Sequence, residues 1–371
     1  MKIALLGFGV VGRGVYDLTK DREDISVSKV LCLEDVTLPD AEVTKNFRDI
    51  VEDETIDTVV ECMGGLHPAF DFVREAVLAG KNIVTSNKAL VASFYDELLP
   101  LVKEKGVLFR CTAAVGGGIG WLSELERSRR AQKILSVGGI MNGTCNYILD
   151  SMTRLGLGYD EALKQAQSLG YAEAKPATDV EGTDTWHKII LSANIAFGVS
   201  LEKETVPVSG IDKIAACDVE QFTAHGYVCK LLSRAEQGEN GIRAFVQPTL
   251  VKQGSLEAAV PLNFNLITFT GAASDRMSFY GQGAGRYPTA YNVVQDLVDV
   301  LAGRGFYAPY GGKTEARNDG KLTYYVRGEA WPEEETAEHW GEGVITKKVS
   351  VEKMHAWRKD HPDAFIAALA E

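Results

Sequence analysis

The sequence has no CxxC pair, no long apolar run and no surplus of basic residues. Its cysteines lack the spacing of a zinc or thiol redox site, and several lie inside apolar stretches. This pattern favours free thiols in a reducing compartment over a disulfide framework, so we expect a cytoplasmic protein. The six cysteines are Cys32, Cys62, Cys111, Cys145, Cys217 and Cys229.

The first apolar stretch, Ile3–Val11, is interrupted by Gly7 and Gly9 and is too short to span a bilayer. It also lacks the small-residue cleavage site of a signal peptide. The formal net charge of −12 argues against nucleic acid or an anionic membrane as the main partner. A small anionic cofactor can still bind, because local backbone dipoles rather than net charge attract it.

The 371 residues, of which 45% are hydrophobic, are enough for two domains with a sizeable core. Strand and helix patterns alternate through the first third, which predicts an α/β fold with a Rossmann-type doubly wound parallel sheet. The later patterns predict an α+β domain with a mixed sheet. We expect a dinucleotide-binding domain at 1–120, a substrate-binding and dimerisation domain at 121–285, and a returning helix with a C-terminal tail at 286–371.

A strand pattern, Lys2–Leu6, leads directly into a GxGxxG motif and then into a helix pattern over 13–20. Gly7 permits a tight turn, Gly9 lets the backbone approach a pyrophosphate, and Gly12 lets helix and strand pack closely. The motif in this context predicts a dinucleotide cofactor, NAD or NADP.

A second strand pattern, Val27–Leu33, ends at Glu34, where the dinucleotide fingerprint places an acid that binds the adenosine ribose. A carboxylate repels a 2′-phosphate, and no arginine follows Glu34 immediately. We therefore expect NAD to be preferred over NADP. A solvated acid at a strand end is the alternative interpretation.

Further strand and helix patterns continue the parallel sheet. Ligands of such sheets bind beyond the carboxyl ends of the strands. Two loops at those ends, Cys62–Gly65 and Thr85–Lys88, are therefore expected to face the cofactor, unless Ser86 only caps a helix and Lys88 lies in solvent. Strands are expected at 58–62, 82–85 and 107–111, and helices at 68–79 and 95–105.

The middle of the chain begins with the glycine-rich run Ala113–Ile119, which suits a hinge or a cation-binding loop. A strand pattern over 137–140 precedes Asn142–Leu149, a helix start with short hydrogen-bonding side chains. Cys145 within it is a candidate nucleophile, although a buried thiol that packs the helix is the favoured interpretation. A helix pattern over 159–169 follows.

The segment Gly170–Leu191 carries four carboxylates and two lysines before an apolar helix. Asp184 and Lys188 lie four residues apart, so a helix from Thr183 places them on one face. A solvated ion pair is the simplest interpretation. Because the first third supplies a nucleotide site that needs a catalytic partner, we favour separate chemical roles for the two residues.

The last third is less informative. Its strand patterns predict the mixed sheet, whose open face or edge favours a homodimer. The glycine-rich loop over 279–286 is followed by a helix that we expect to return to the nucleotide domain. Strands are expected at 242–251, 264–270 and 322–326, a helix at 291–301, an acidic loop at 333–338, and a helical stretch at 351–369 that Pro362 interrupts.

Six motifs in this order resemble the homoserine dehydrogenase family over roughly residues 1–305. They are GFGVVG, TSNKAL, AAVGGGI, NGTCNYIL, GYAEAKPATDVEGTDTWHK and FYGQGAGRYPTA. The long fifth motif, with NGTCNYIL before it, is the most specific. The resemblance implies NAD(P)-dependent interconversion of L-homoserine and L-aspartate 4-semialdehyde, in threonine and methionine biosynthesis, by a protein that is usually dimeric.

The resemblance also implies roles for individual residues. Lys88 and Lys188 match the catalytic lysines, and Glu173 and Asp184 match the substrate-binding acids. A sodium ion is implied on backbone carbonyls of Thr112, Val115, Gly117 and Ile119. The expected cofactor contacts are Gly7, Gly9, Val10, Val11, Gly12, Glu34, Ser86, Lys88, Gly170 and Gly283.

Three features depart from that family. Thr112 stands where relatives commonly have Glu, and Gly120 where they have Pro, which weakens the sodium assignment. The residues after the matching part look too few for the regulatory ACT domain of many relatives, so feedback inhibition by threonine is not expected. Glu34 favours NAD, where many relatives use NADP.

Two other functions stay open from the residues themselves. One is an aldehyde dehydrogenase that acts through a Cys145 thiohemiacetal, and the other is a non-catalytic NAD-sensing protein. For the favoured function, a lysine acid–base group needs desolvation or a nearby charge to lower its pKa from about 10.4. A tight pair with Asp184 opposes this, so we expect Asp184 to contact substrate instead.

Overall fold

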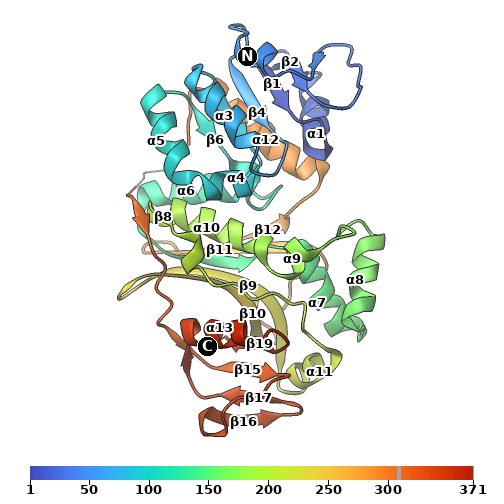
Figure 1. Cartoon of the computed structure of the whole chain (residues 1–371), viewed down its shortest axis with the longest axis vertical. Coiled ribbons are helices and arrows are strands. Elements are labelled where there is room, and N and C mark those ends of the chain that lie inside the picture. The colour runs from blue at the N-terminus through green and yellow to red at the C-terminus, as the bar shows by residue number, and fades with distance from the viewer. Residues whose placement is uncertain (307–310, 371) are drawn as a thin grey trace. The chain divides into compact units, whose positions relative to one another are not determined.

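The computed structural model describes residues 1–306 and 311–370. The chain forms two compact units, each assembled from separate parts of the sequence (Figure 1). The first unit contains residues 1–132, 194–200 and 281–313, and the second contains 133–193, 201–280 and 314–371. The chain passes from one unit to the other near residues 132, 193, 200, 280 and 313. The sequence analysis predicted domain boundaries after residues 120 and 285.

The first unit is built on a six-stranded parallel sheet in the order β3-β2-β1-β4-β5-β6. The order reverses between β1 and β4, so this is a doubly wound sheet with its switch point beside the glycine motif. The expected Rossmann-type fold is confirmed. Its strands are β1 (Lys2–Leu6), β2 (Ser26–Leu31), β3 (Glu42–Thr44), β4 (Thr58–Glu61), β5 (Asn82–Thr85) and β6 (Phe109–Arg110).

Helices cover both faces of this sheet, and one of them comes from much later in the chain. That helix, α12, packs against α1 at Gly14, where a Cβ atom would lie only 2.8 Å from the side chain of Ala290 (Figure 1). The helices are α1 (Val10–Thr19), α2 (Arg48–Val51), α3 (Ala69–Leu78), α4 (Lys88–Ser93), α5 (Tyr95–Lys105), α6 (Trp121–Ala131) and α12 (Arg286–Leu301), with a 3-10 turn η1 (Thr112–Ala114).

A buried ion pair fixes α12 to the sheet. Arg110 in β6 donates from Nε to Asp296 of α12 at 2.8 Å, and both side chains are at most 5% exposed. Asp296 also accepts from the backbone N–H of Thr112 at 2.7 Å. Breaking such a pair from one side leaves a buried charge unpaired, at a cost of about 3–5 kcal/mol. The late helix is therefore an integral part of the nucleotide unit.

The second unit is built on a nine-stranded mixed sheet in the order β12-β11-β7-β9-β10-β19-β15-β17-β16. Its centre is the long antiparallel hairpin of β9 and β10, and helix α7 packs on β9 and β11. The mixed sheet is confirmed. Its strands are β7 (Ile134–Ile140), β9 (Tyr227–Gly238), β10 (Gly241–Lys252), β11 (Phe264–Gly271), β12 (Asp275–Gln282), β15 (Tyr324–Arg327), β16 (Thr336–Trp340), β17 (Gly343–Thr346) and β19 (Phe365–Leu369).

The remaining helices of the chain range from four to fifteen residues in length. They are α7 (Gly143–Leu155), α8 (Tyr159–Ser168), α9 (Ala177–Val180), α10 (Thr183–Phe197), α11 (Ala216–Ala224) and α13 (Val351–Asp360). Two strand pairs stand apart from the main sheets, β8 (Ser200–Leu201) with β13 (Lys313–Thr314) and β14 (Lys321–Leu322) with β18 (Val349–Ser350). No helix of the described residues is long and apolar enough to cross a membrane.

Besides the acidic loop expected at 333–338, of which residues 336–338 belong to strand β16, three sequence predictions of local structure were wrong. The glycine-rich loop expected at 279–286 is strand β12 through Gln282, because its backbone pairs with β11. The helical stretch expected at 351–369 is interrupted near Pro362, as predicted, since α13 ends at Asp360, but residues 365–369 form strand β19 between β10 and β15 instead of a second helical part. The second strand ends at Leu31 rather than at Leu33, which leaves Glu34 in the following loop. The first two errors arose because pairing with distant strands decided the conformation.

One lysine is fully buried in the second sheet. Lys230 of β9 has no solvent exposure, and its Nζ donates to Asn146 Oδ1 and to the Val260 carbonyl, each at 2.8 Å. Burial lowers the pKa of Lys230 to about 8. The folded protein therefore releases this proton at a lower pH than the unfolded chain, whose lysines have a pKa of about 10.4.

Lys230 should make stability depend on pH in the alkaline range. Between about pH 8 and 10.4 the unfolded state binds more protons, so wild-type stability should rise with pH, by up to roughly 3 kcal/mol. The Lys230→Met variant lacks this group and should not show that gain. Urea unfolding of both proteins at pH 7.5 and pH 10 measures the difference, and parallel pH profiles would contradict the assignment.

Candidate active site

The glycine motif has the geometry that a dinucleotide needs. Gly7 adopts a φ of +94°, and a Cβ atom there would lie 3.0 Å from the Cys62 carbonyl. A Cβ on Gly12 would lie 2.2 Å from the Gly7 carbonyl. Above Gly9 there is open space, since no atom lies within 4 Å of a Cβ built there. Gly9 therefore gives a ligand direct access to the backbone.

The first turn of α1 adds hydrogen-bond donors to this access. Gly9 is the N-cap, no side chain caps the helix, and no acidic residue lies in its first turn. The backbone N–H groups of Val10 and Val11 therefore stand at the positive end of the helix dipole, where phosphates bind. Val10 is 65% exposed, so the turn is open to solvent.

Glu34 lies in the loop after β2, and its side chain is 74% exposed. Arg13 of α1 pairs with it, with Nη2 3.2 Å from Oε2, and also donates from Nε to the Phe8 carbonyl at 2.9 Å. The sequence prediction considered only arginines after Glu34 and so missed Arg13. The edge of the expected adenosine site thus carries both an acid and a base.

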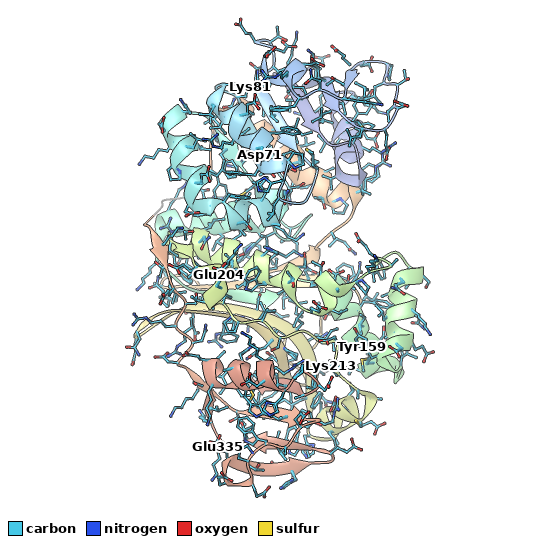
Figure 2. The ribbon with its side chains drawn as sticks, in the orientation of Figure 1. Asp71, Lys81, Tyr159, Glu204, Lys213 and Glu335 are labelled. Carbon is cyan, nitrogen blue, oxygen red and sulfur yellow. The ribbon has the colours of Figure 1, made fainter. Side chains whose placement is uncertain are left out.

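Two further loops follow the carboxyl ends of β4 and β5. The second contains Ser86 and Asn87, and Asn87 Oδ1 caps α4 by accepting from Leu90 N at 3.1 Å. Lys88 is the first residue of α4 and is half-buried. In Figure 2 Lys81, just before β5, and Asp71, in the first turn of α3, mark the amino and carboxyl edges of this sheet.

The second unit contains a buried cluster around Lys188. Lys188 Nζ donates to Asp184 Oδ2 and to the Met141 carbonyl, each at 2.7 Å. Both charged side chains are about nine-tenths buried. The prediction that they share one face of a helix from Thr183 is confirmed. The two side chains also pair, and because the pair is buried the solvated ion pair was wrong. Contact of Asp184 with substrate stays a prediction.

Asn142 extends this cluster to a second acid. Its Nδ2 donates to Asp184 Oδ2 at 2.8 Å and to Asp179 Oδ1 at 2.7 Å, while its Oδ1 caps α7. Burial, followed by the Asp184 charge, raises the pKa of Asp179. Sequence reasoning gave neither Asn142 nor Asp179 a chemical role. A sequence signal for their importance was present, because Asn142 and Asp179 lie in the two most specific motifs of the chain.

The loop after α8 carries the other expected residues. Gly170 ends the helix with a φ of +75°, and there is open space above it. Thr144 Oγ1 donates to the Tyr171 carbonyl at 2.5 Å, which ties the loop to the start of α7. The carboxylate of Glu173 is exposed to solvent. The loop that carries the Glu173 carboxylate is therefore tied to the start of α7, the helix that Asn142 of the Lys188 cluster caps.

Cys145 is buried and unsuited to act as a nucleophile. It is fully inaccessible, its Sγ donates to the Asp179 carbonyl at 3.1 Å, and its backbone N–H is occupied by the Asn142 cap. Burial raises the pKa of the Cys145 thiol well above its usual value, with Asp179 and Asp184 adding to the shift. Nucleophilic cysteines have the opposite environment. The thiohemiacetal route is therefore disfavoured.

The loop expected to hold sodium is packed closely against the turn before α12. Gly117 has a φ of +45°, and a Cβ there would lie 2.6 Å from the Gly283 carbonyl. The Gly117 carbonyl accepts from Asn292 Nδ2, and the Ile119 carbonyl accepts from Trp121 N. Two of the four proposed oxygen ligands, which also include Thr112 and Val115, thus already have partners. Packing explains the loop's glycines, and the fit to a metal ion is partial.

Comparison with known proteins agrees with this geometry. The family model described as homoserine dehydrogenase matches residues 121–298, and the model of the homoserine dehydrogenase NAD binding domain matches residues 7–111. The chain belongs to the homoserine dehydrogenase family. It is 36% identical to the homoserine dehydrogenase of Bacillus subtilis over 315 residues, which cover 81% of this chain and 73% of that protein.

Other homoserine dehydrogenases are equally similar. That of Corynebacterium glutamicum is 38% identical over 314 residues, covering 80% of this chain and 71% of the relative. The crystal structure of a homoserine dehydrogenase from Thiobacillus denitrificans aligns with a TM-score of 0.85 at 30% identity, covering 100% of this chain and 98% of that one. The family confirms the expected oxidoreductase activity and gives no support to a sensing protein or a thiol-dependent aldehyde dehydrogenase.

Replacement of Cys145 tests the thiol route directly. In Cys145→Ser the hydroxyl can still donate to the Asp179 carbonyl, so kcat with homoserine should stay within about threefold of wild type. Steady-state NADH formation measures it. A loss of several orders of magnitude, in a variant that unfolds at the wild-type temperature, would restore the covalent mechanism.

Proposed function

We propose that this chain oxidises L-homoserine to L-aspartate 4-semialdehyde and catalyses the reverse reduction, within threonine and methionine biosynthesis. The observation that carries the proposal is the buried Lys188–Asp184 pair with Asn142 and Asp179. A nicotinamide cofactor, NAD or NADP, supplies the hydride acceptor or donor when it is bound. The residues of the chain must then place the substrate and manage one proton.

Lys188 is the proposed proton donor and acceptor. An ammonium group has three N–H donors, and Met141 and Asp184 occupy two of them. The third can donate to the oxygen on the reacting carbon of the substrate. In the reducing direction this proton neutralises the alkoxide as hydride arrives, and in the oxidising direction the lysine takes it back. Asp184 holds the ammonium in place.

The substrate's own ammonium is the proposed partner of the acids. Asp179 and Asp184 outnumber Lys188 in the cluster, which favours a positively charged ligand group. Glu173 adds an exposed carboxylate on the neighbouring loop. Two fixed contacts, ammonium on acids and hydroxyl on lysine, orient the carbon for hydride transfer. Lys88, from the nucleotide unit, is proposed as the second catalytic lysine.

Removing Lys188 should abolish most of the chemistry. In Lys188→Ala, kcat should fall by about 10²–10⁴-fold, the usual contribution of a general acid or base, whereas NADH should bind as before. Stopped assays give kcat and NADH fluorescence titration gives the affinity. Lys164→Ala, which removes an exposed lysine from α8, is the matched control. A near-normal kcat for Lys188→Ala would refute the proposed role.

NAD is the proposed preferred cofactor, because Glu34 would repel a 2′-phosphate. The proposed contacts are the backbone of Gly7, Gly9, Val10, Val11 and Gly12, together with Glu34, Ser86, Lys88, Gly170 and Gly283. Gly283 lies in the turn between β12 and α12. A sodium ion on the carbonyls of Thr112, Val115, Gly117 and Ile119 remains a secondary proposal, and no catalytic step depends on it.

Neutralising Glu34 should shift the cofactor preference. In Glu34→Gln the like-charge repulsion is lost while Arg13 remains, so kcat/KM with NADP should rise relative to NAD by on the order of tenfold. Parallel assays of wild type and variant with both cofactors measure the ratio. A wild-type enzyme that strongly prefers NADP would overturn the proposed role of Glu34.

The functional assembly is proposed to be a homodimer in the cytoplasm. Edge strand β12 is mostly exposed, with Met277 and Tyr280 at 41% and 54% exposure, which favours cover by a second copy of the sheet. All six cysteines are free thiols, which suits a reducing compartment. Only small molecules are proposed as substrates, with neither nucleic acid nor membrane as partner.

A further inference from the structure

The last residue of β4 is a carboxylate that the proposed mechanism does not use. Glu61 has no solvent exposure, and it stands at the carboxyl end of the strand, at the switch point of the sheet. A buried carboxylate is costly unless its oxygens are satisfied. The groups that satisfy it therefore indicate what it does.

Four donors converge on the two carboxylate oxygens. Oε1 accepts from the backbone N–H groups of Met63 at 2.8 Å and Gly64 at 3.3 Å, and from Asn87 Nδ2 at 3.4 Å. Oε2 accepts from Thr85 Oγ1 at 2.5 Å. Burial raises the pKa of Glu61, and these hydrogen bonds oppose the shift. Both oxygens of the Glu61 side chain therefore accept hydrogen bonds and neither donates, which requires an ionised carboxylate.

The donors belong to two loops that are separate in sequence. Met63 and Gly64 form the turn after β4, and this turn packs against Gly7. A Cβ atom on Gly7 would lie 3.1 Å from the Cα atom of Met63. Gly64 and Gly65 have positive φ and open space above them. The turn therefore lies beside the glycine motif that is proposed to contact the cofactor.

The other two donors lead to Lys88. Thr85 Oγ1 accepts from Asn87 N at 3.0 Å, and Asn87 Nδ2 bridges from Glu61 to the Gly65 carbonyl at 2.7 Å. The Asn87 Oδ1 atom then caps α4 through Leu90 N. Lys88 is the first residue of that helix. The residue before it, Asn87, is bonded to Thr85 and Glu61, and Leu90, two residues after it, is bonded to Asn87, so the backbone of Lys88 is fixed on both sides.

We propose that Glu61 is a positioning residue, whose carboxylate locks the Asn87 cap to the Met63–Gly65 turn and thereby fixes the backbone that carries Lys88. The inference rests on the proposed function of Lys88. It assigns to Glu61 a much larger effect on the chemical step than on cofactor affinity, because most of the proposed cofactor contacts, including the phosphate-binding N–H groups of α1, lie outside this network.

The Glu61→Gln variant tests the proposal. A carboxamide keeps the shape of the side chain, but its NH₂ group cannot accept the hydrogen bonds that one carboxylate oxygen accepts. Asn87 and the Met63–Gly65 turn are then no longer joined by these bonds. We expect kcat to fall by about 10–100-fold, as for lost orientation of a catalytic group, while the Kd for NADH changes less than about threefold. The primary deuterium isotope effect on kcat, measured with deuterated reduced cofactor, should rise because hydride transfer becomes slower than product release. A mere loss of folded enzyme would leave that isotope effect unchanged.

A double-mutant cycle shows whether Glu61 acts through Asn87. Asn87→Asp keeps the cap of α4 but loses the donors to Glu61 and Gly65. If both residues serve one network, kcat of Glu61→Gln/Asn87→Asp should lie within about threefold of the worse single variant. Additive losses would refute the coupling. If Glu61→Gln does not fold, Thr85→Val interrupts the same network with the carboxylate retained, and it should show the same isotope effect.

The controls separate this inference from the function on which it rests. Glu97→Gln removes an exposed acid from α5 of the same unit and should match wild type in all three measurements. Wild-type enzyme without homoserine-dependent NADH formation would overturn the proposed function itself. Wild-type turnover with an unaltered kcat and isotope effect in Glu61→Gln would overturn the role of Glu61 alone.

Discussion

The buried pair of Lys188 and Asp184 is the constraint on which the second unit depends. Two charges removed from water need compensating partners, and the Met141 carbonyl and the Asn142 amide supply them. These partners stand at the junction of β7 and α7, so the strand, the helix cap and the start of α10 must meet at one point. Holding the lysine in this way uses two of the three N–H groups of its ammonium.

The glycine motif of the nucleotide unit is determined by backbone geometry. Gly7 and Gly12 are required by distances that admit no Cβ, and Gly9 by the need for an open approach. Buried polar residues then fix the loops around this motif: Arg110 and Asp296 anchor the late helix, and Glu61 joins the turns after β4 and β5. In both units, a buried polar group connects segments that are distant in sequence.

The features of the fold that depend on local signals were predictable from the sequence. The strand, glycine motif and helix at the start of the chain follow from spacing and from the sterics of glycine, and the motif order pointed to the family. Prediction failed where the partner was remote. Residues 365–369 became a strand because β10 and β15 lie on either side of them, and Asp179 acquired a place in the site only through Asn142. Arg13 was missed beside Glu34 for the same reason.

The sequence by itself determined the doubly wound nucleotide fold, the candidate lysines and acids, and the helical register that puts Asp184 and Lys188 on one face. Local backbone geometry and a four-residue period are enough for each of these. Only the tertiary structure decided that this pair is buried, that Cys145 is sealed from solvent and that Glu61 joins two loops. Burial and hydrogen-bond partners depend on which distant segments pack together, and no single stretch of sequence carries that information.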